Sequence, residues 1–535
     1  MKGMFARLSV RQVVYMALIV ALLLPLSMLS QPASSDRARN PGGQLAQLRS
    51  TYKLGDSNIG QIDVRSQVVR LASLGLTGFA NLILNVQADE YKTAEDWTRY
   101  RAALDQLIYL SPYYPKVWEN QAWNLSYNLA AEFDDVHDKY YWIMNGVQLL
   151  QRGTTYLDDN PRLLWYTGWV VTNKVGRADE RVQLRKMFAI DEDFHKQQRV
   201  QQRDNWLFGR EYYLLAQDAV DTRGARMNSM DPLIFNFFPI QPQMFSADAL
   251  VSDHQSELEA VMAAYPSASP ERKQRLAEID GKYLQMIRAR WAIALRELRE
   301  FGDRPFVAET GTIYRLSDKA ETQRQLEESI AKLDGISPDL RKRLRDERFA
   351  KLPLEKKSAL AADAKTRTTE QERLAEEAEA ELTVTDDDLA AGVDADKRDE
   401  ATKLVAAIHD LREKNFRILK AREHLIHYDY WLSRAEVEQL EEAREAYRHL
   451  AHGAVAYKID ADPAQARREL EQGFVQWRKV LDKHPMMLND QTATTIDQSV
   501  KLYAQALQQL DEPFPKNFIL KDLVEAVGND EPVKE

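Results

Sequence analysis

The sequence predicts an all-α protein made of tetratricopeptide-like helical hairpins, with an N-terminal transmembrane helix and a charged, coiled-coil-like middle segment. Three observations support this fold class. Apolar residues recur at spacings of three and four along most of the chain, which is the period of an amphipathic helix. Glycine (21) and proline (19) are sparse among the 535 residues, so helices meet few breaks. Two segments also combine proline, tryptophan and small residues in the order that joins successive helical hairpins.

The composition excludes several classes of function. The formal net charge is -10, which argues against a general nucleic-acid binder, because such a protein needs a basic surface. The chain has no cysteine, so it forms no disulfide, thiolate nucleophile, iron–sulfur cluster or cysteine zinc site. It also lacks a phosphate-binding loop, a nucleophile elbow and a zinc-protease motif. We therefore expect neither a cofactor nor a nucleic-acid partner.

Residues 1–30 predict a cytoplasmic head and a membrane anchor. Lys2, Arg7 and Arg11 are basic, and Val13–Leu29 carries no charge. As a helix this run is about 25 Å long, slightly less than the roughly 30 Å hydrocarbon core, and flanking polar residues can reach the headgroups. A cleaved signal peptide is the alternative, but the run is longer than usual and the cleavage sites are poor, which favours a retained anchor. The basic head should stay inside, so we expect a single-pass protein with its body on the periplasmic side.

Residues 31–56 predict a polar linker, and residues 57–225 a tetratricopeptide-like domain. Its first hairpin join contains Pro112, Trp118 and Ala122. Proline ends one helix because it lacks an N–H, the tryptophan opens the next helix, and the small residue lets two helices approach closely. The first join therefore predicts two helices packed against each other.

A second join contains Pro161, Trp165 and Gly168. Ala122 and Gly168 are 46 residues apart, whereas the usual period is about 34 residues. We therefore expect an inserted piece, and residues 132–142 are the candidate. Two joins are fewer than a free-standing solenoid needs, so neighbouring helices must complete the stack.

Residues 226–316 predict an aromatic, proline-rich loop followed by helical structure. Met230–Ala249 contains three prolines, and we expect it to be extended or looped yet buried. Ser269 followed by Pro270 predicts a helix start that leads to Phe301. A short pair of strands is expected within residues 305–316.

Residues 317–400 are rich in charge and alanine and predict solvated helices, for which a coiled-coil arm is one arrangement. Thr368 and Thr385 each precede a carboxylate- or amide-bearing residue three positions on, which predicts capping boxes. Residues 401–520 predict a second helical-repeat-like domain. It opens with apolar residues at heptad spacing around Ile408, which form either a short heptad seam or the core face of a long helix. Residues 521–535 are expected to form a tail.

Several segments resemble a known protein family. They are WENQAWNLSY from Trp118, the following FDDVHDKYYW, YDYW from Tyr428 and GFVQW from Gly473. The resemblance is to membrane-anchored, tetratricopeptide-like bacterial proteins found mainly in planctomycetes, some of which are labelled "iron responsive element". It covers most of residues 60–520. It implies an envelope location and helical repeats, and it supplies no catalytic residue. An acidic chain without an RNA motif does not support iron-responsive RNA binding.

Aromatic residues gather between the two joins. The partner-binding candidates are Trp118, Trp123, Tyr127, Trp165 and Trp169, with further tyrosines nearby. One interpretation is an aromatic-lined groove for a peptide or a glycan. The other, which we favour, is packing of the repeat core.

Two groups of residues are weak candidates for metal ligands. His424 and His427, and likewise His449 and His452, are three residues apart and so share a helix face. Four imidazoles could converge if the two helices were neighbours, but no metal motif supports this, and surface or interhelical histidines are the favoured interpretation. Asp134, Asp135, His137 and Asp138 could bind a cation, although a polar loop or helix end held by Lys139 and Arg152 is the favoured interpretation.

The sequence therefore favours a membrane-tethered helical-repeat scaffold that mediates protein–protein interaction in the cell envelope. A component of a secretion or envelope-assembly complex would be one form of such a scaffold. The alternative is an envelope hydrolase or metal-dependent enzyme, with its site in the aromatic region or at the histidine pairs.

Overall fold

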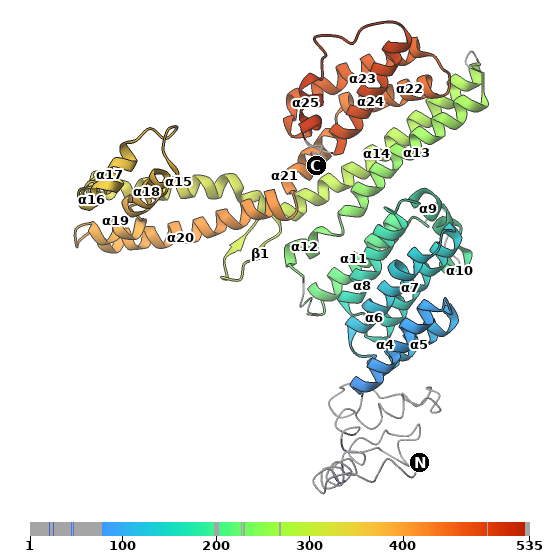
Figure 1. Cartoon of the computed structure of the whole chain (residues 1–535), viewed down its shortest axis with the longest axis horizontal. Helices are drawn as coiled ribbons and strands as arrows, with labels where there is room; N and C mark the ends of the chain where they lie inside the picture. The colour runs from blue at the N-terminus through green and yellow to red at the C-terminus, as the bar shows by residue number, and fades with distance from the viewer. Residues whose placement is uncertain are drawn as a thin grey trace. The chain divides into compact units, whose positions relative to one another are not determined.

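The computed structural model describes residues 77–529, with gaps at 197–198, 200–202, 226, 228–229, 267–268 and 489–490, and four single positions nearer the N-terminus. The described residues are almost entirely helical (Figure 1), which confirms the all-α prediction. None of their helices is long and apolar enough to span a membrane. The predicted anchor at Val13–Leu29 lies outside the described residues, apart from Ala21 and Pro25, and stays a prediction. The chain divides into two compact units, Met1–Ser229 and Met230–Glu535.

Antiparallel helices make up the described part of the first unit, and two of them continue into π-helical turns, η2 and η4. The elements are α4 (Thr77–Thr93), α5 (Trp97–Leu110), α6 (Pro115–Trp123), η2 (Asn124–Leu129), η3 (Ala130–Glu132), α7 (Val136–Tyr156), α8 (Pro161–Val170), η4 (Val171–Val175), α9 (Arg181–Ile190), α10 (Glu192–His195) and α11 (Asn205–Asp221).

Both predicted joins mark helix boundaries. Pro115 and Pro161 occupy the first turns of α6 and α8, where a missing N–H costs no hydrogen bond. Residues 132–142, however, are not an inserted element. The helix that begins at Pro115 continues through η2 and η3 to Glu132, and α7 begins at Val136. The 46-residue spacing therefore reflects two long helices and two short turns.

The second unit opens with a segment for which the sequence prediction was wrong. Met230–Ala249 is helical, with α12 (Pro232–Phe237) followed directly by α13 (Gln241–Ala264). Pro232 and Pro242 lie in the first turns of these helices, which tolerate proline. The expected burial is confirmed, since Leu233 and Met244 are in the core.

Helix α14 (Pro270–Asp303) begins at its Ser269 cap, as predicted. The expected strand pair follows: β1 (Phe306–Val307) is antiparallel to β2 (Ile313–Tyr314), with Phe306 opposite Tyr314. The 3-10 turn η6 (Leu316–Asp318) leads from the strands into the charged segment.

The charged segment forms an arm in which α15 and α20 run side by side with short helices near one end (Figure 1). Its helices are α15 (Lys319–Ile336), α16 (Leu340–Lys351), α17 (Leu354–Ala361), α18 (Thr369–Leu382), α19 (Asp386–Gly392) and α20 (Arg398–Lys420). Both capping boxes, at Thr368 and Thr385, are confirmed. Ile408 of the predicted seam is fully buried in the core of the arm.

The C-terminal residues are helical, as predicted, with one exception. Their helices are η7 (Ala421–Leu425), α21 (Tyr428–Val437), α22 (Glu441–Lys458), α23 (Pro463–Lys483), η8 (Pro485–Leu488), α24 (Gln491–Gln509) and α25 (Lys521–Asn529). Phe474 and Trp477 lie in their common core. The exception is the predicted tail, because α25 occupies residues 521–529 and buries Leu523 in that core.

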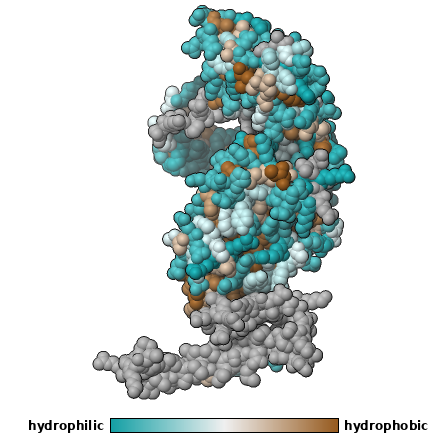
Figure 2. All heavy atoms as spheres, turned by 90° about the vertical axis from the view of Figure 1, so that its right-hand side faces the viewer, coloured by the Kyte–Doolittle hydropathy of each residue, from teal (hydrophilic) through white to brown (hydrophobic). Residues whose placement is uncertain are grey.

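The described surface is mainly hydrophilic, with hydrophobic residues in small separate patches on the face drawn in Figure 2. Charged residues make up 29% of the chain. Several aromatic side chains are nevertheless exposed, among them Trp123 of the first unit.

Candidate partner-binding site

Five aromatic rings of the first unit stack on one another and form what we call the aromatic ladder. Its members are Trp123, Tyr127, Trp165, Tyr166 and Trp169. The rings of Trp123 and Tyr127 are nearly parallel, at 4°, with centroids 4.0 Å apart. Trp169 lies 5.9 Å from Trp123 and 5.5 Å from Tyr166. Four of the five predicted partner-binding residues therefore come together.

Helix geometry explains how the ladder forms. Trp123 ends α6 and Tyr127 follows four residues later in η2, so both rings project from one face. Trp165 and Trp169 have the same spacing on α8. A π-helical segment begins directly after Trp123, and another begins two residues after Trp169. Such bulges are rare and occur frequently at functional sites.

The ladder lies at the surface and is only partly covered. Trp123 is 38% exposed, and the other four rings are half-buried. The ammonium of Lys174 lies 4.4 Å from the Tyr127 ring centroid, an attractive cation–π contact. Burial lowers the pKa of Lys174, and burial together with Tyr166 raises the pKa of the Tyr127 hydroxyl. Tyr127 therefore remains a neutral ring at physiological pH.

Close helix packing holds the ladder rigid. Gly168 of α8 faces Gly209 of α11 so closely that a Cβ at Gly168 would lie 2.6 Å from the Gly209 carbonyl oxygen. Gly146 of α7 is similarly close to α6, because a Cβ there would lie 2.9 Å from the Ala122 carbonyl oxygen. These glycines and Ala122 bring the helix backbones together, as the small residues of the joins predicted.

A line of amide side chains on the α6–η2 helix was not recognised in the sequence. Asn120, Asn124 and Asn128 follow one another at four-residue spacing. The Asn128 amide donates to the Asn124 side-chain oxygen at 2.8 Å, and Asn124 donates to the Gln121 side-chain oxygen at 3.1 Å. The regular spacing was visible in the sequence, but its position beside the aromatic rings depends on the η2 turn.

Trp118, the fifth predicted residue, does not belong to the ladder. It is 3% exposed, and its indole N–H donates to the Pro112 carbonyl oxygen. It packs against Tyr156. Trp118 is therefore a core residue, as the packing interpretation predicted, and its burial leaves little of the ring for a partner to contact.

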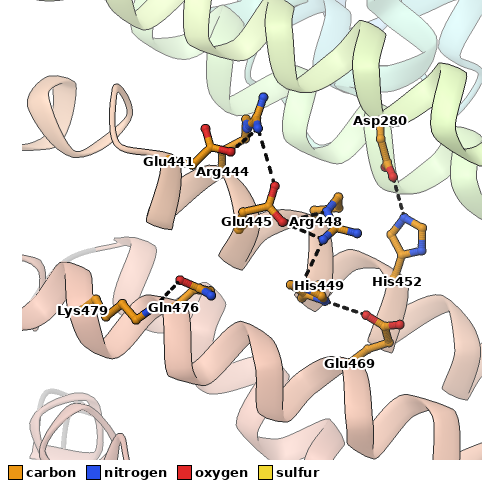
Figure 3. A network of polar contacts seen from close by, with 10 residues as sticks. All are labelled: Asp280, Glu441, Arg444, Glu445, Arg448, His449, His452, Glu469, Gln476 and Lys479. Carbon is orange, nitrogen blue, oxygen red and sulfur yellow. Dashed lines mark hydrogen bonds and ion pairs between the residues drawn. The ribbon is translucent and has the colours of Figure 1, made fainter.

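The two histidine pairs do not form a four-imidazole site. His424 and His427 are exposed. His449 and His452, on α22, instead contact the carboxylates of Glu469 and Asp280 (Figure 3). In the described part of the chain, no group of three or more histidines and carboxylates could hold a metal ion.

The acidic cluster at residues 134–138 forms a helix end. Asp135 is the N-cap of α7, and its carboxylate accepts the backbone N–H of His137 at 2.7 Å. This hydrogen bond lowers the pKa of Asp135. The polar helix-end interpretation therefore accounts for Asp135.

Comparison with protein-family models, curated proteins and solved structures finds no match for this chain.

Proposed function

We propose that this chain is a non-enzymatic scaffold that binds a protein partner through the aromatic ladder and is tethered to the membrane by its N-terminal segment. The ladder is the observation that supports partner binding. Tryptophan and tyrosine are enriched among residues that dominate binding energy, because a large rigid ring loses little entropy when it is covered. We also infer that the hairpins of the first unit are tetratricopeptide-like, since the joins at Pro112 and Pro161 have the residue order of that repeat.

The arrangement of the rings favours a polypeptide over a glycan or a nucleic acid. Trp123, Tyr127 and Trp169 stack face to face, so much of the ring area that a sugar or base would cover is already occupied. The amide line of Asn120, Asn124 and Asn128 lies on the same α6–η2 helix as Trp123 and Tyr127. Amide side chains carry both donors and acceptors and can pair with the N–H and C=O groups of an extended chain. An acidic protein of net charge -10 is also poorly suited to nucleic acid.

The membrane tether is the second part of the proposal. Val13–Leu29 is uncharged and follows a basic head, as expected of an anchor that leaves the body on the periplasmic side. A tethered scaffold would hold its partner at one membrane surface. Components of secretion or envelope-assembly complexes act in this manner, so such a complex is one form that the partner could take.

Affinity purification of the full-length chain from membranes tests the proposal. The ladder variant is Trp123→Ala, because this ring is the most exposed of the five, and the matched control is Tyr109→Ala, an aromatic residue that is 53% exposed outside the ladder. We expect a partner to copurify with the wild type and the control. The amount of this partner should fall at least about tenfold with Trp123→Ala. The purified partner should then bind the purified wild-type chain and the control, and should bind the Trp123→Ala variant more weakly.

Two outcomes would contradict the proposal. One is recovery of the chain without any partner. The other is a partner whose binding is the same in the wild type and the Trp123→Ala variant. Fractionation of the same cells tests the tether independently, since the chain should remain with membranes after washing at high salt.

A further inference from the structure

Helix α4 exposes a row of large apolar side chains, which we call the α4 stripe. Its members are Phe79, Leu82, Ile83 and Val86, which are 64%, 61%, 38% and 50% exposed. The last three lie three, four and seven residues after the first, so all four share one face of the helix. No charged residue precedes Asp89 in α4. The α4 stripe therefore leaves apolar surface in contact with water along two turns of the helix.

The opposite face of α4 is already packed. Ala80, Leu84 and Ala88 are buried in the core of the first unit, where α5 is the neighbouring helix. A helix that is apolar on all sides is typical of one that is covered on all sides. The outermost element of a stack of helices needs a polar outer face to be soluble. Because α4 comes first among the described elements (Figure 1) and its outer face is apolar, a further element should cover it.

The sequence directly before α4 contains a second row of apolar residues with the same spacing. Val64, Val68 and Leu71 fall on one face of a helix, and Asp63 and Arg70 fall on the other side. These five positions lie outside the residues that the structure describes. The chain thus supplies a second amphipathic pattern within a few residues of the α4 stripe.

The two rows are mirror images of each other about Gly75. The mirrored positions lie four, seven and eleven residues away from this glycine on either side, and they are Leu71 and Phe79, Val68 and Leu82, and Val64 and Val86. Glycine is common where a chain reverses direction, because it adopts backbone conformations that other residues avoid. Two antiparallel helices joined at Gly75 would therefore bring mirrored positions side by side. Neither a second copy of the chain nor a lipid surface would require this register.

We propose that residues 59–74 form a helix that folds back on α4, covers the α4 stripe and becomes the outermost helix of the first unit. The driving force is the burial of apolar surface from both rows. The short connection gives an effective concentration of about millimolar or higher, which favours this segment over a second copy. The contact is independent of the aromatic ladder, and it requires neither the membrane anchor nor the proposed partner.

Thiol cross-linking tests the proposal, because the chain has no cysteine of its own. The variant Val68→Cys with Leu82→Cys, made in the full-length chain in detergent, places thiols at two mirrored positions. Mild oxidation should join them in an intramolecular disulfide at least about tenfold faster than in the control pair Arg70→Cys with Leu82→Cys. The control closes a loop of nearly the same length, but Arg70 falls on the other side of the proposed helix.

A second measurement does not depend on the geometry of a disulfide. The single thiol of Leu82→Cys should react with a maleimide at least about tenfold faster when Val68→Asp is added, because a carboxylate cannot be buried against the α4 stripe without a large cost. The matched control is Arg70→Asp, which should leave the reaction rate unchanged.

Three outcomes would overturn the proposal. The first is an equal rate of disulfide formation in the two cysteine pairs, together with a maleimide rate that Val68→Asp does not change. The second is a disulfide-linked dimer in place of the intramolecular product, which would identify a second copy as the cover of α4. The third is protection of the Leu82→Cys thiol only after the chain is placed in phosphatidylglycerol vesicles, which would identify a lipid surface instead.

Discussion

The indole N–H of Trp118 donates a 2.8 Å hydrogen bond to the carbonyl oxygen of Pro112, six residues earlier. This bond joins the turn after α5 to the first turns of α6. The ring also fills the space above Gly153 of α7, where a Cβ would lie 2.9 Å from it. A residue bound on two sides in this way stabilises the hairpin and is not accessible to a partner.

The first prediction separates this core tryptophan from the ladder. Trp118→Ala should lower the free energy of unfolding by about 3–5 kcal/mol, because it leaves a cavity and an unpaired carbonyl. Trp123→Ala should cost less than about 1 kcal/mol, since its ring is partly in solvent already. Urea unfolding followed by circular dichroism measures both losses. Equal losses would show that the ladder is part of the core.

Features that depend on neighbouring residues could be predicted from the sequence. The Ser269 cap with Pro270, and the capping boxes at Thr368 and Thr385, involve residues within three positions of one another, so the pattern in the sequence is the interaction itself. The helical character of Met230–Ala249 could not be predicted in this way. Proline at the first turn of a helix and proline in a loop leave the same sequence signal, and only the packing of the segment distinguishes them.

Contacts between residues far apart in the chain could not be predicted from the sequence. Trp118 and Trp123 are equally aromatic, but Tyr156, Gly153 and the Pro112 carbonyl surround only Trp118. His452 was a recognised candidate, but its partner Asp280 lies 172 residues away and has no motif around it. Such a pair cannot be recognised in a single sequence, because only the fold brings its two residues together.

Glycine contacts between α22 and α23 give a second prediction. A Cβ at Gly453 would lie 2.7 Å from Leu470, and one at Gly473 would lie 2.7 Å from Leu450. Gly453→Ala should therefore destabilise the second unit by about 1–3 kcal/mol, because the two helices must move apart.

The control for this prediction is Gly281→Ala in the middle of α14. No atom lies within 4 Å of a Cβ at this position, so the helix should gain about 0.5–1 kcal/mol from the higher helix propensity of alanine. The thermal midpoints of the two variants should shift in opposite directions. A Gly453→Ala variant with an unchanged or raised thermal midpoint would show that α22 and α23 are not in close contact.

The acid stability of the second unit gives a third prediction. Burial would raise the pKa of Asp280, but hydrogen bonds from His254 and His452 outweigh burial and lower this pKa from 3.8 to about 2 in the folded state. The ionised form of Asp280 therefore stabilises the fold above about pH 4, and this contribution is lost as the pH falls toward 2. Asp280→Asn should lower the free energy of unfolding by about 1–2 kcal/mol at neutral pH, allowing for partial solvent screening.

The difference in free energy of unfolding between the Asp280→Asn variant and the wild type should disappear as the pH falls from about 4 to 2. Urea unfolding midpoints across this range give the measurement. The control is Asp346→Asn, which removes an exposed carboxylate on α16. Its free energy of unfolding should differ little from that of the wild type at all pH values. If the difference in free energy of unfolding stayed constant into acid, the hydrogen bonds from His254 and His452 would not be what keeps Asp280 ionised.

A buried ion pair between α21 and the turn that follows it gives the last prediction. The Arg434 guanidinium, 7% exposed, donates to the Glu438 carboxylate at 2.8 Å and lies 5.3 Å from the Trp291 ring centroid. Tyr447 donates its hydroxyl to the same carboxylate, and burial raises its pKa well above the usual range. Removing one partner of such a pair leaves the other charge buried.

Arg434→Met should therefore cost about 3–5 kcal/mol in free energy of unfolding. The double variant Arg434→Met with Glu438→Leu should recover part of this loss, because it removes both charges, although Tyr447 is left without its acceptor. Urea unfolding of the wild type, the two single variants and the double variant gives the coupling energy. If the double variant loses as much as the two single variants together, the coupling energy is zero, and the pair between Arg434 and Glu438 does not stabilise the fold.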